Sequence, residues 1–167
     1  LTIMAHYGLY TYIAPLVNHF NFYGGIKLAS TLFGIGTIIS VVIAAKVVDT
    51  HLGPLIIFKL SLALATMLLF VVFKGMLIVS HIAFLLWGVS FGALVTIFQA
   101  AVTKQVETGK DVATSLQSST FNFGIVLGSA LGGLILDNSS VFYIIFVTMA
   151  LLVVPILLSF SKKRIFS

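Results

Sequence analysis

Long apolar segments alternate with short polar breaks along the whole chain. A helix that crosses a bilayer needs roughly 20 mostly apolar residues, and these segments approach or reach that length. Turn and charge signals such as Gly24-Gly25 and Lys74-Gly75 separate them. The pattern predicts an all-α membrane protein, a single bundle over residues 1–167 whose six transmembrane helices span residues 1–17, 32–48, 55–73, 77–100, 115–136 and 141–160.

The composition supports a membrane location and narrows the chemistry. Hydrophobic residues make up 60% of the chain and charged residues only 8%, with a mean hydropathy of +1.21. A water-soluble domain of 167 residues needs more polar surface than this. The absence of cysteine excludes disulfides and thiolate metal sites, and the sequence has neither a metal-ligand cluster nor a phosphate-binding loop. We therefore expect no cofactor and no bound metal.

The basic residues are distributed unequally between the two sides of the predicted bundle. Six spans put both termini on one side, and only Lys27 and Lys74 fall on the opposite side. The positive-inside rule then predicts a multi-pass protein of the cell (plasma) membrane with cytoplasmic N- and C-termini. The residues on the terminal side are Lys46, Lys59, Lys104, Lys110, Lys162, Lys163 and Arg164.

Two further expectations follow from the charges and the first residues. Lys59 lies just inside its predicted span, from which a lysine can extend its ammonium to the interface. The net charge of +5 comes from the asymmetry between the two sides and forms no clustered basic face, so no nucleic-acid partner is expected. The chain begins at Leu1 inside an apolar run and lacks a signal-peptide pattern, so we expect further sequence upstream.

Small residues indicate which spans pack against other helices. In lipid, helices associate through close approach at small residues and through polar contacts. The spans over 55–73 and 141–160 contain no glycine and are predicted to face lipid. A glycine-free span thus closes each group of three, which suggests a three-plus-three inverted repeat. The glycines predicted to pack are Gly34, Gly88, Gly92, Gly124, Gly128 and Gly132.

Polar residues within the apolar spans form stripes on the first, fourth and fifth spans. His6 and Tyr10 lie one turn apart, Gln99 ends a stripe on the fourth span, and Ser118 and Asn122 share a face of the fifth. Any one of them could simply bond its own or a neighbouring helix, a contact worth about 0.6 kcal/mol. Three stripes together favour a shared polar cavity, and these five residues are our candidates for a substrate path. An intramembrane histidine is a functional candidate in its own right.

One short motif points to a different chemistry. Gly88-Val89-Ser90-Phe91-Gly92 matches the G-x-S-x-G nucleophile pattern of hydrolases. That chemistry needs a strained strand-to-helix turn, whereas this copy lies inside a long apolar helix. We therefore rank an intramembrane hydrolase last and predict that the protein is not an enzyme.

Three segments resemble one family of transporters. Residues 9–15, Leu-Tyr-Thr-Tyr-Ile-Ala-Pro, resemble the seventh helix of major facilitator transporters in the drug and sugar efflux branch. Phe121-Asn122-Phe123-Gly124 through Asp137 resembles the eleventh helix, and residues 34–49 are similar to the eighth helix and the loop after it. The resemblance covers essentially the whole chain, as helices seven to twelve of a twelve-helix transporter.

The resemblance implies the C-terminal half of a secondary active efflux permease for sugars, drugs or other small organic molecules. Such a permease would be proton-coupled and would work by alternating access. Asp49 would belong to a loop that helps lock one conformation, although the arginines usual in that loop are absent here. No Asp or Glu lies within a predicted span, so coupling would fall to the other half, to His6 or to another ion.

Two other interpretations stay open at this point. The chain could be a self-contained six-helix protein that works as a homodimer, or a non-transport membrane subunit whose glycine faces serve assembly. A half-bundle would expose its polar stripes to lipid. Besides the bilayer and a small-molecule substrate, the expected partner is therefore the missing N-terminal six-helix half or a second copy of the chain.

Overall fold

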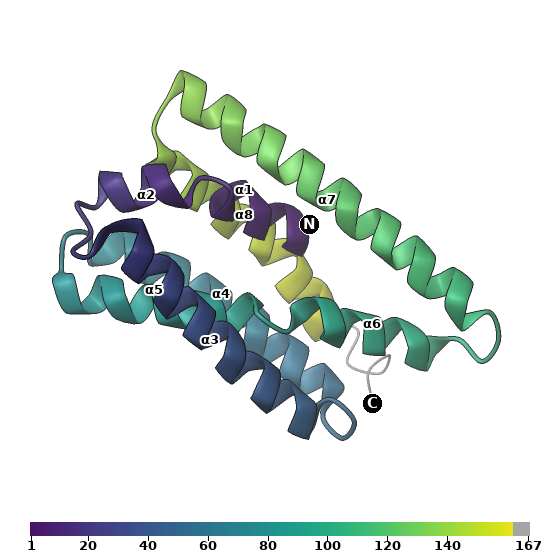
Figure 1. Ribbon diagram of the computed structural model, residues 1–167. Coiled ribbons are helices and arrows are strands. Elements are labelled where there is room, and N and C mark those ends of the chain that lie inside the picture. The colour runs from purple at the N-terminus through teal and green to yellow at the C-terminus, as the bar shows by residue number, and fades with distance from the viewer. Residues whose placement is uncertain (162–167) are drawn as a thin grey trace.

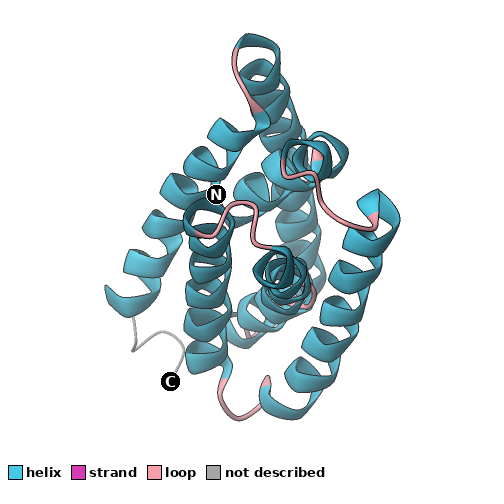
Figure 2. Cartoon of the chain, turned by 90° about the vertical axis from the view of Figure 1, so that its left-hand side faces the viewer, coloured by secondary structure: helices cyan, strands magenta, loops and turns pink. Residues whose placement is uncertain are grey.

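The computed structural model describes residues 1–161, and every regular element among them is a helix (Figures 1 and 2). Lys162, Lys163 and Arg164, three of the basic residues assigned to the terminal side, lie outside the described residues. The helices are α1 (Thr2–Tyr10), α2 (Ile13–His19), α3 (Gly25–Val47), α4 (Leu52–Val72), α5 (Leu77–Phe91), α6 (Leu94–Gln105), α7 (Lys110–Asn138) and α8 (Val141–Ser161).

Two helices begin earlier than the apolar pattern predicted. The second span was predicted from residue 32 and the fifth from residue 115, whereas α3 starts at Gly25 and α7 at Lys110. Each starts directly after a glycine with a left-handed backbone, Gly24 (φ +87°) and Gly109 (φ +71°), a conformation that few other residues adopt easily. Lys27 in the first turn of α3 and Lys110-Asp111 in the first turn of α7 lower the local hydropathy, so hydropathy alone does not reveal where these helices begin.

The first and fourth predicted spans are each divided into two helices. Pro15 in the first turn of α2 has no N–H to donate to the carbonyl of Thr11, and the helix is interrupted just before it, at Thr11-Tyr12. Between α5 and α6 the break falls at Gly92-Ala93. Five segments of the described chain are long and apolar enough to cross a membrane: 25–47, 52–72, 77–105, 110–138 and 141–161. The first predicted span is filled by two short helices instead.

The helices form two groups of three spans that share one pattern of contacts. In one group α1 packs against α7 and α8, and in the other α5 packs against α3 and α4 (Figure 1). The contact between α4 and α8 joins the groups. The two groups are related by a shift of three spans: the first span corresponds to the fourth, the second to the fifth and the third to the sixth. A three-plus-three repeat requires this correspondence.

Glycines bring two helix pairs into backbone contact. A Cβ built on Gly88 of α5 would meet the carbonyl of Phe33 on α3, and a Cβ on Gly128 of α7 would meet the carbonyl of Met4 on α1. Gly92, Gly124 and Gly132 also face the neighbouring helix of their pair. Such close approach is how helices associate in lipid, where apolar surface gives no preference for protein.

The packing face of α3 differs from the prediction at one position. No atom lies within 4 Å of a Cβ built on Gly34, whereas a Cβ on Gly36 would meet the carbonyl of Leu85. Two residues along a helix correspond to a rotation of about 200°, so the two glycines face opposite sides. The contact predicted for Gly34 is therefore made by Gly36.

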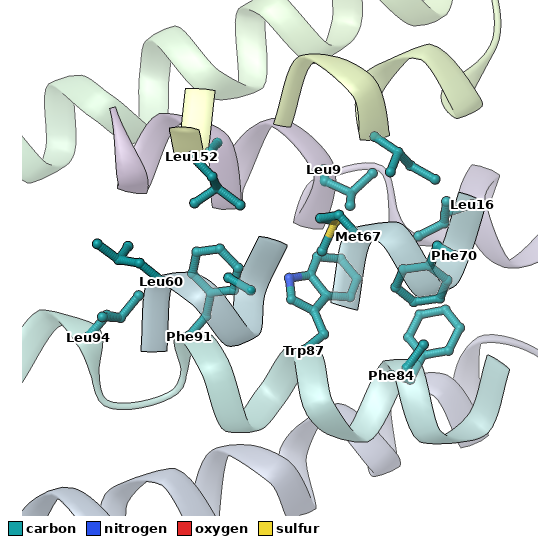
Figure 3. Packing of buried hydrophobic residues seen from close by; sticks show 14 of the residues in the cluster. Leu9, Leu16, Leu60, Met67, Phe70, Phe84, Trp87, Phe91, Leu94 and Leu152 are labelled. Atoms are coloured by element: carbon teal, nitrogen blue, oxygen red, sulfur yellow. The ribbon is translucent and has the colours of Figure 1, made fainter. Parts of the chain in front are cut away.

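The glycine-free helices are more buried than their composition suggested. Over its most apolar stretch α4 has 44% of its residues buried, whereas glycine-rich α7 has 11%. Leu60 and Met67 of α4 and Leu152 of α8 belong to the core, which also contains Phe84 and Trp87 of α5 (Figure 3). The third and sixth spans, predicted to face lipid, thus also have an inner face, where their large side chains fill the space between the two groups.

Candidate functional site

His6 and Tyr10 lie in an aromatic cluster formed by three helices. The His6 ring stacks on Phe91 of α5 with centroids 4.3 Å apart and on Tyr10 at 5.2 Å. Phe33 of α3 stacks on His6 from 5.9 Å, and Trp87 of α5 presents its edge at 5.9 Å. We call His6, Tyr10, Phe33, Trp87 and Phe91 the aromatic cluster.

Two polar atoms in the aromatic cluster are buried without a partner. Within the described part of the chain, neither Nδ1 of His6 nor Nε1 of Trp87 makes a hydrogen bond. Buried polar atoms are nearly always paired, either with protein or with ordered water. The cluster therefore combines flat apolar surfaces with two unused hydrogen-bonding atoms, a combination suited to a ring-shaped ligand with polar substituents.

Three members of the aromatic cluster were not found from the sequence. Trp87 and Phe91 are four residues apart, so they share a helix face just as His6 and Tyr10 do. They were overlooked because large apolar residues are ordinary in a membrane span. The matching four-residue spacing of aromatic rings on the first and fourth spans is the signal that would have indicated them.

The other three candidate residues meet at a small polar cavity between α6 and α7. Gln99, Ser118 and Asn122 line this cavity, which has a volume of about 170 Å³. Gln117, which the sequence analysis did not select, also lines it, and its buried Oε1 has no hydrogen-bond partner among the described residues. Ser118 donates its hydroxyl to the carbonyl of Thr114 at 2.9 Å, so its hydrogen is already used within the helix.

Tyr7 connects the aromatic cluster to the polar cavity. Its ring lies 4.9 Å from that of His6 and 6.1 Å from that of Phe121, both nearly perpendicular. Phe121 itself lines the polar cavity beside Asn122. The five candidate residues therefore form two neighbouring groups joined by aromatic contacts, rather than one compact site.

A larger apolar cavity adjoins the polar one. Its volume is about 700 Å³, within the range of roughly 300–1,000 Å³ that is usual for small-molecule sites. Leu1 of the N-terminus, Leu60 of α4, Phe98 of α6 and Pro155 of α8 contribute to its wall. Gln117 and Phe121 line both cavities, so the two spaces share one side of α7.

The loop after α3 is held by a residue from the fourth span. Lys104 near the end of α6 donates to the backbone carbonyl of Asp49 at 3.0 Å and to that of Val48 at 3.4 Å. A cation stabilises the negative end of a helix, where carbonyls lack a partner within the helix. The structure thus places a lysine from a distant part of the sequence at the loop whose usual arginines are missing.

The serine of the hydrolase-like motif has a structural role. Ser90 is buried and donates its hydroxyl to the carbonyl of Trp87 at 2.8 Å. His81 contacts the carbonyl of Leu77 and packs on the ring of Phe22, 4.5 Å away. Neither contact resembles a nucleophile bonded to a general base.

Comparison with known proteins gives matches over nearly the whole chain. The family profile described as Major Facilitator Superfamily matches residues 1–164. A "Probable sugar efflux transporter" of Helicobacter pylori strain J99 is 26% identical over 153 residues, which cover 90% of this chain and 39% of that protein. A protein of the same name from Mannheimia succiniciproducens is 27% identical over 143 residues, 83% of this chain and 35% of the relative.

A third relative of the same name, from Haemophilus influenzae strain PittGG, is 28% identical over 139 residues, which cover 80% of this chain and 34% of that protein. No solved structure matches the chain. The chain therefore spans less than two fifths of the length of each of these relatives. The profile match, together with the all-helical membrane architecture, shows that the chain is a multi-pass membrane protein that belongs to the Major Facilitator Superfamily.

Proposed function

We propose that this chain is the C-terminal half of a secondary active permease of the cell membrane that exports sugars or similar small organic molecules, with both termini in the cytoplasm. The observation that carries the proposal is the placement of the five candidate residues in two adjoining groups on α1, α6 and α7. The polar face of α7 is largely exposed, as expected of a helix that awaits a partner bundle. The name shared by the relatives, "Probable sugar efflux transporter", supports sugar export.

The two groups would recognise different parts of a substrate. Trp87 and Phe91 are buried in this conformation, so they would present flat faces to a ring only once the helices open. His6 Nδ1 and Trp87 Nε1 would then be available to hydroxyl groups. The amides of Gln99 and Asn122 supply both donors and acceptors at the polar cavity. A mostly apolar site with a few such groups orients a small molecule without binding it too tightly to release.

Alternating access would depend on the divided first and fourth spans. Transporters commonly build their central site from such interrupted helices, and the two bundles rock around it. In this chain the breaks lie beside the aromatic cluster: Tyr10 ends α1 and Phe91 ends α5. Proton coupling would fall to His6 in this half, because Asp49, Glu107, Asp111 and Asp137 all lie in loops or at helix ends.

Expression of the chain with and without a partner half tests the proposal. Export of labelled sugars is measured from cells that produce the chain alone, or together with the first six spans of the Helicobacter pylori relative. We expect export only with the partner. Export by the chain alone would indicate a homodimer. If neither expression gives export although the chain is shown to be in the membrane, the result would favour an assembly subunit.

The role of His6 is tested through the pH dependence of export. His6→Phe keeps the stacking on Phe91 but removes both ring nitrogens. We expect the dependence of export on external pH to flatten in this variant, because the imidazole, which is the candidate proton carrier of the aromatic cluster, is lost. The matched control is His81→Phe, whose imidazole is bonded to its own helix. A pH profile that matches the unsubstituted protein would exclude a coupling role for His6.

A further inference from the structure

Lys59 is buried completely inside the bundle. Its exposed fraction is 0%, and its Nζ donates to the hydroxyl of Ser40 at 2.5 Å and to the carbonyl of Val89 at 2.6 Å. The sequence analysis expected this lysine to extend toward the membrane interface, and that expectation is wrong. Instead the side chain runs from α4 to the point where α5 ends.

One backbone hydrogen bond is missing where α5 ends, and Lys59 and Ser40 bind the acceptor and the donor that it would have joined. In a continuous helix the N–H of Ala93 would donate to the carbonyl of Val89, four residues earlier. Here Ala93 N–H donates to Ser40 Oγ at 3.1 Å, and the Val89 carbonyl accepts from Lys59. Side chains from α3 and α4 therefore stand in for one backbone hydrogen bond, a recognised cause of a helix kink. We call this arrangement the Lys59–Ser40 bridge.

Nothing in the covalent structure of the fourth span forces this break. The first span contains Pro15, but no proline occurs between residues 77 and 105. Gly92 is small enough to sit against Thr37 of α3 and does not prevent a continuous helix. Among the described contacts, those of the bridge are the ones that occupy the two backbone groups left unpaired at this break.

A buried lysine without an acidic partner is costly to keep for stability alone. Within residues 1–161 the partners of the Lys59 ammonium are a hydroxyl and a carbonyl, and no carboxylate pairs with it. A charge inside a membrane span is costly, and apolar replacement of buried charges is often neutral or stabilising. The cost indicates a role beyond holding the fold together.

We propose that Lys59 is a positioning residue that keeps the fourth span broken and thereby sets the direction of α6. Gln99 lies on α6, so the bridge fixes its distance from Asn122 across the polar cavity. When the bridge withdraws, the Ala93–Val89 bond forms, α5 and α6 become one helix, and the cavity changes shape. The link to substrate access rests on the proposed function, whereas the link between the bridge and the helix break does not.

Distance measurements by double electron–electron resonance test this directly. The chain lacks cysteine, so spin labels attach only to the two cysteines that are introduced. These are Ile78→Cys and Gln99→Cys, both at exposed positions. In a continuous helix two Cα atoms 21 residues apart are separated by roughly 31 Å. We expect Lys59→Met, which keeps the length of the side chain but donates nothing, to shift the distribution toward this separation in the purified full chain in lipid.

Three comparisons make the test decisive. Ser40→Ala removes a single oxygen from the bridge and should give the same shift in distance. This variant keeps the test available if Lys59→Met does not fold. The double variant should shift no further than either single one. Lys46→Met, at an exposed lysine of α3, should leave the distribution unchanged. Unchanged distances in both bridge variants, or an equal shift in Lys46→Met, would overturn the proposal. No transport is measured, so failure of the proposed function would not affect this result.

Discussion

Gly88→Ala is expected to destabilise the folded bundle strongly, whereas Gly34→Ala is expected to leave it as stable or slightly more stable. A Cβ on Gly88 would collide with the backbone carbonyl of Phe33 and lie 3.0 Å from the amide nitrogen of Thr37. Backbone atoms cannot rotate aside, so α3 and α5 would have to separate. Overpacking of this kind typically costs about 1–3 kcal/mol, and separation of the helices adds the loss of their mutual contact.

The two substitutions make a matched pair because they add the same methyl group to facing helices. At Gly34 the methyl meets no atom within 4 Å, and alanine favours a helix over glycine by about 1 kcal/mol. Stability is measured by unfolding the purified chain in mixed micelles with increasing denaturing detergent, followed by circular dichroism. Equal midpoints for the two variants would show that α3 and α5 do not meet at Gly88.

Asn122→Leu is expected to reduce export by about one to two orders of magnitude in cells that also contain the N-terminal partner half. Leucine has the same number of side-chain heavy atoms as asparagine and the same branching at Cγ, so the change removes the amide at the polar cavity without altering the outline of the side chain greatly. A polar group of the substrate left unpaired costs about 1–3 kcal/mol, and each 1.36 kcal/mol changes a rate tenfold.

The same helix offers a control with an identical substitution. Asn138 ends α7 and donates its side-chain amide to the carbonyl of Leu134 at 2.8 Å, away from both cavities. We expect Asn138→Leu to export normally and both variants to reach the membrane in similar amounts. Normal export by Asn122→Leu would show that Asn122 does not belong to the substrate path.

The sequence predicted the helical spans well because membrane insertion depends on local hydropathy. It also predicted the glycine contacts of α5 and α7, since small residues at four-residue spacing form one helix face. The break at Gly92-Ala93 was not predictable in this way. It requires Ser40 and Lys59, which lie far along the chain and meet Val89 and Ala93 only after three helices have packed.

Burial of the large apolar residues was also beyond prediction from a single chain. Leucine and phenylalanine are equally soluble in lipid and in a protein core, so composition cannot tell which face of α4 meets lipid and which meets α5. The same ambiguity hid Trp87 and Phe91, whose importance becomes visible only when His6 lies against them. Polar residues were easier to select because each is costly in lipid and needs a reason to be there.

The glycine contacts determine where this bundle is stiff. At Gly128 of α7, and at Gly36 and Gly88 between α3 and α5, the facing backbones touch directly, so no side chain at these points can change rotamer to absorb a displacement. Between α4 and α8 the contact consists of long side chains such as Leu60, Met67 and Leu152. Packed helices of this second kind slide past one another by small amounts. Movement of one group of three spans against the other is therefore a shear along α4 and α8.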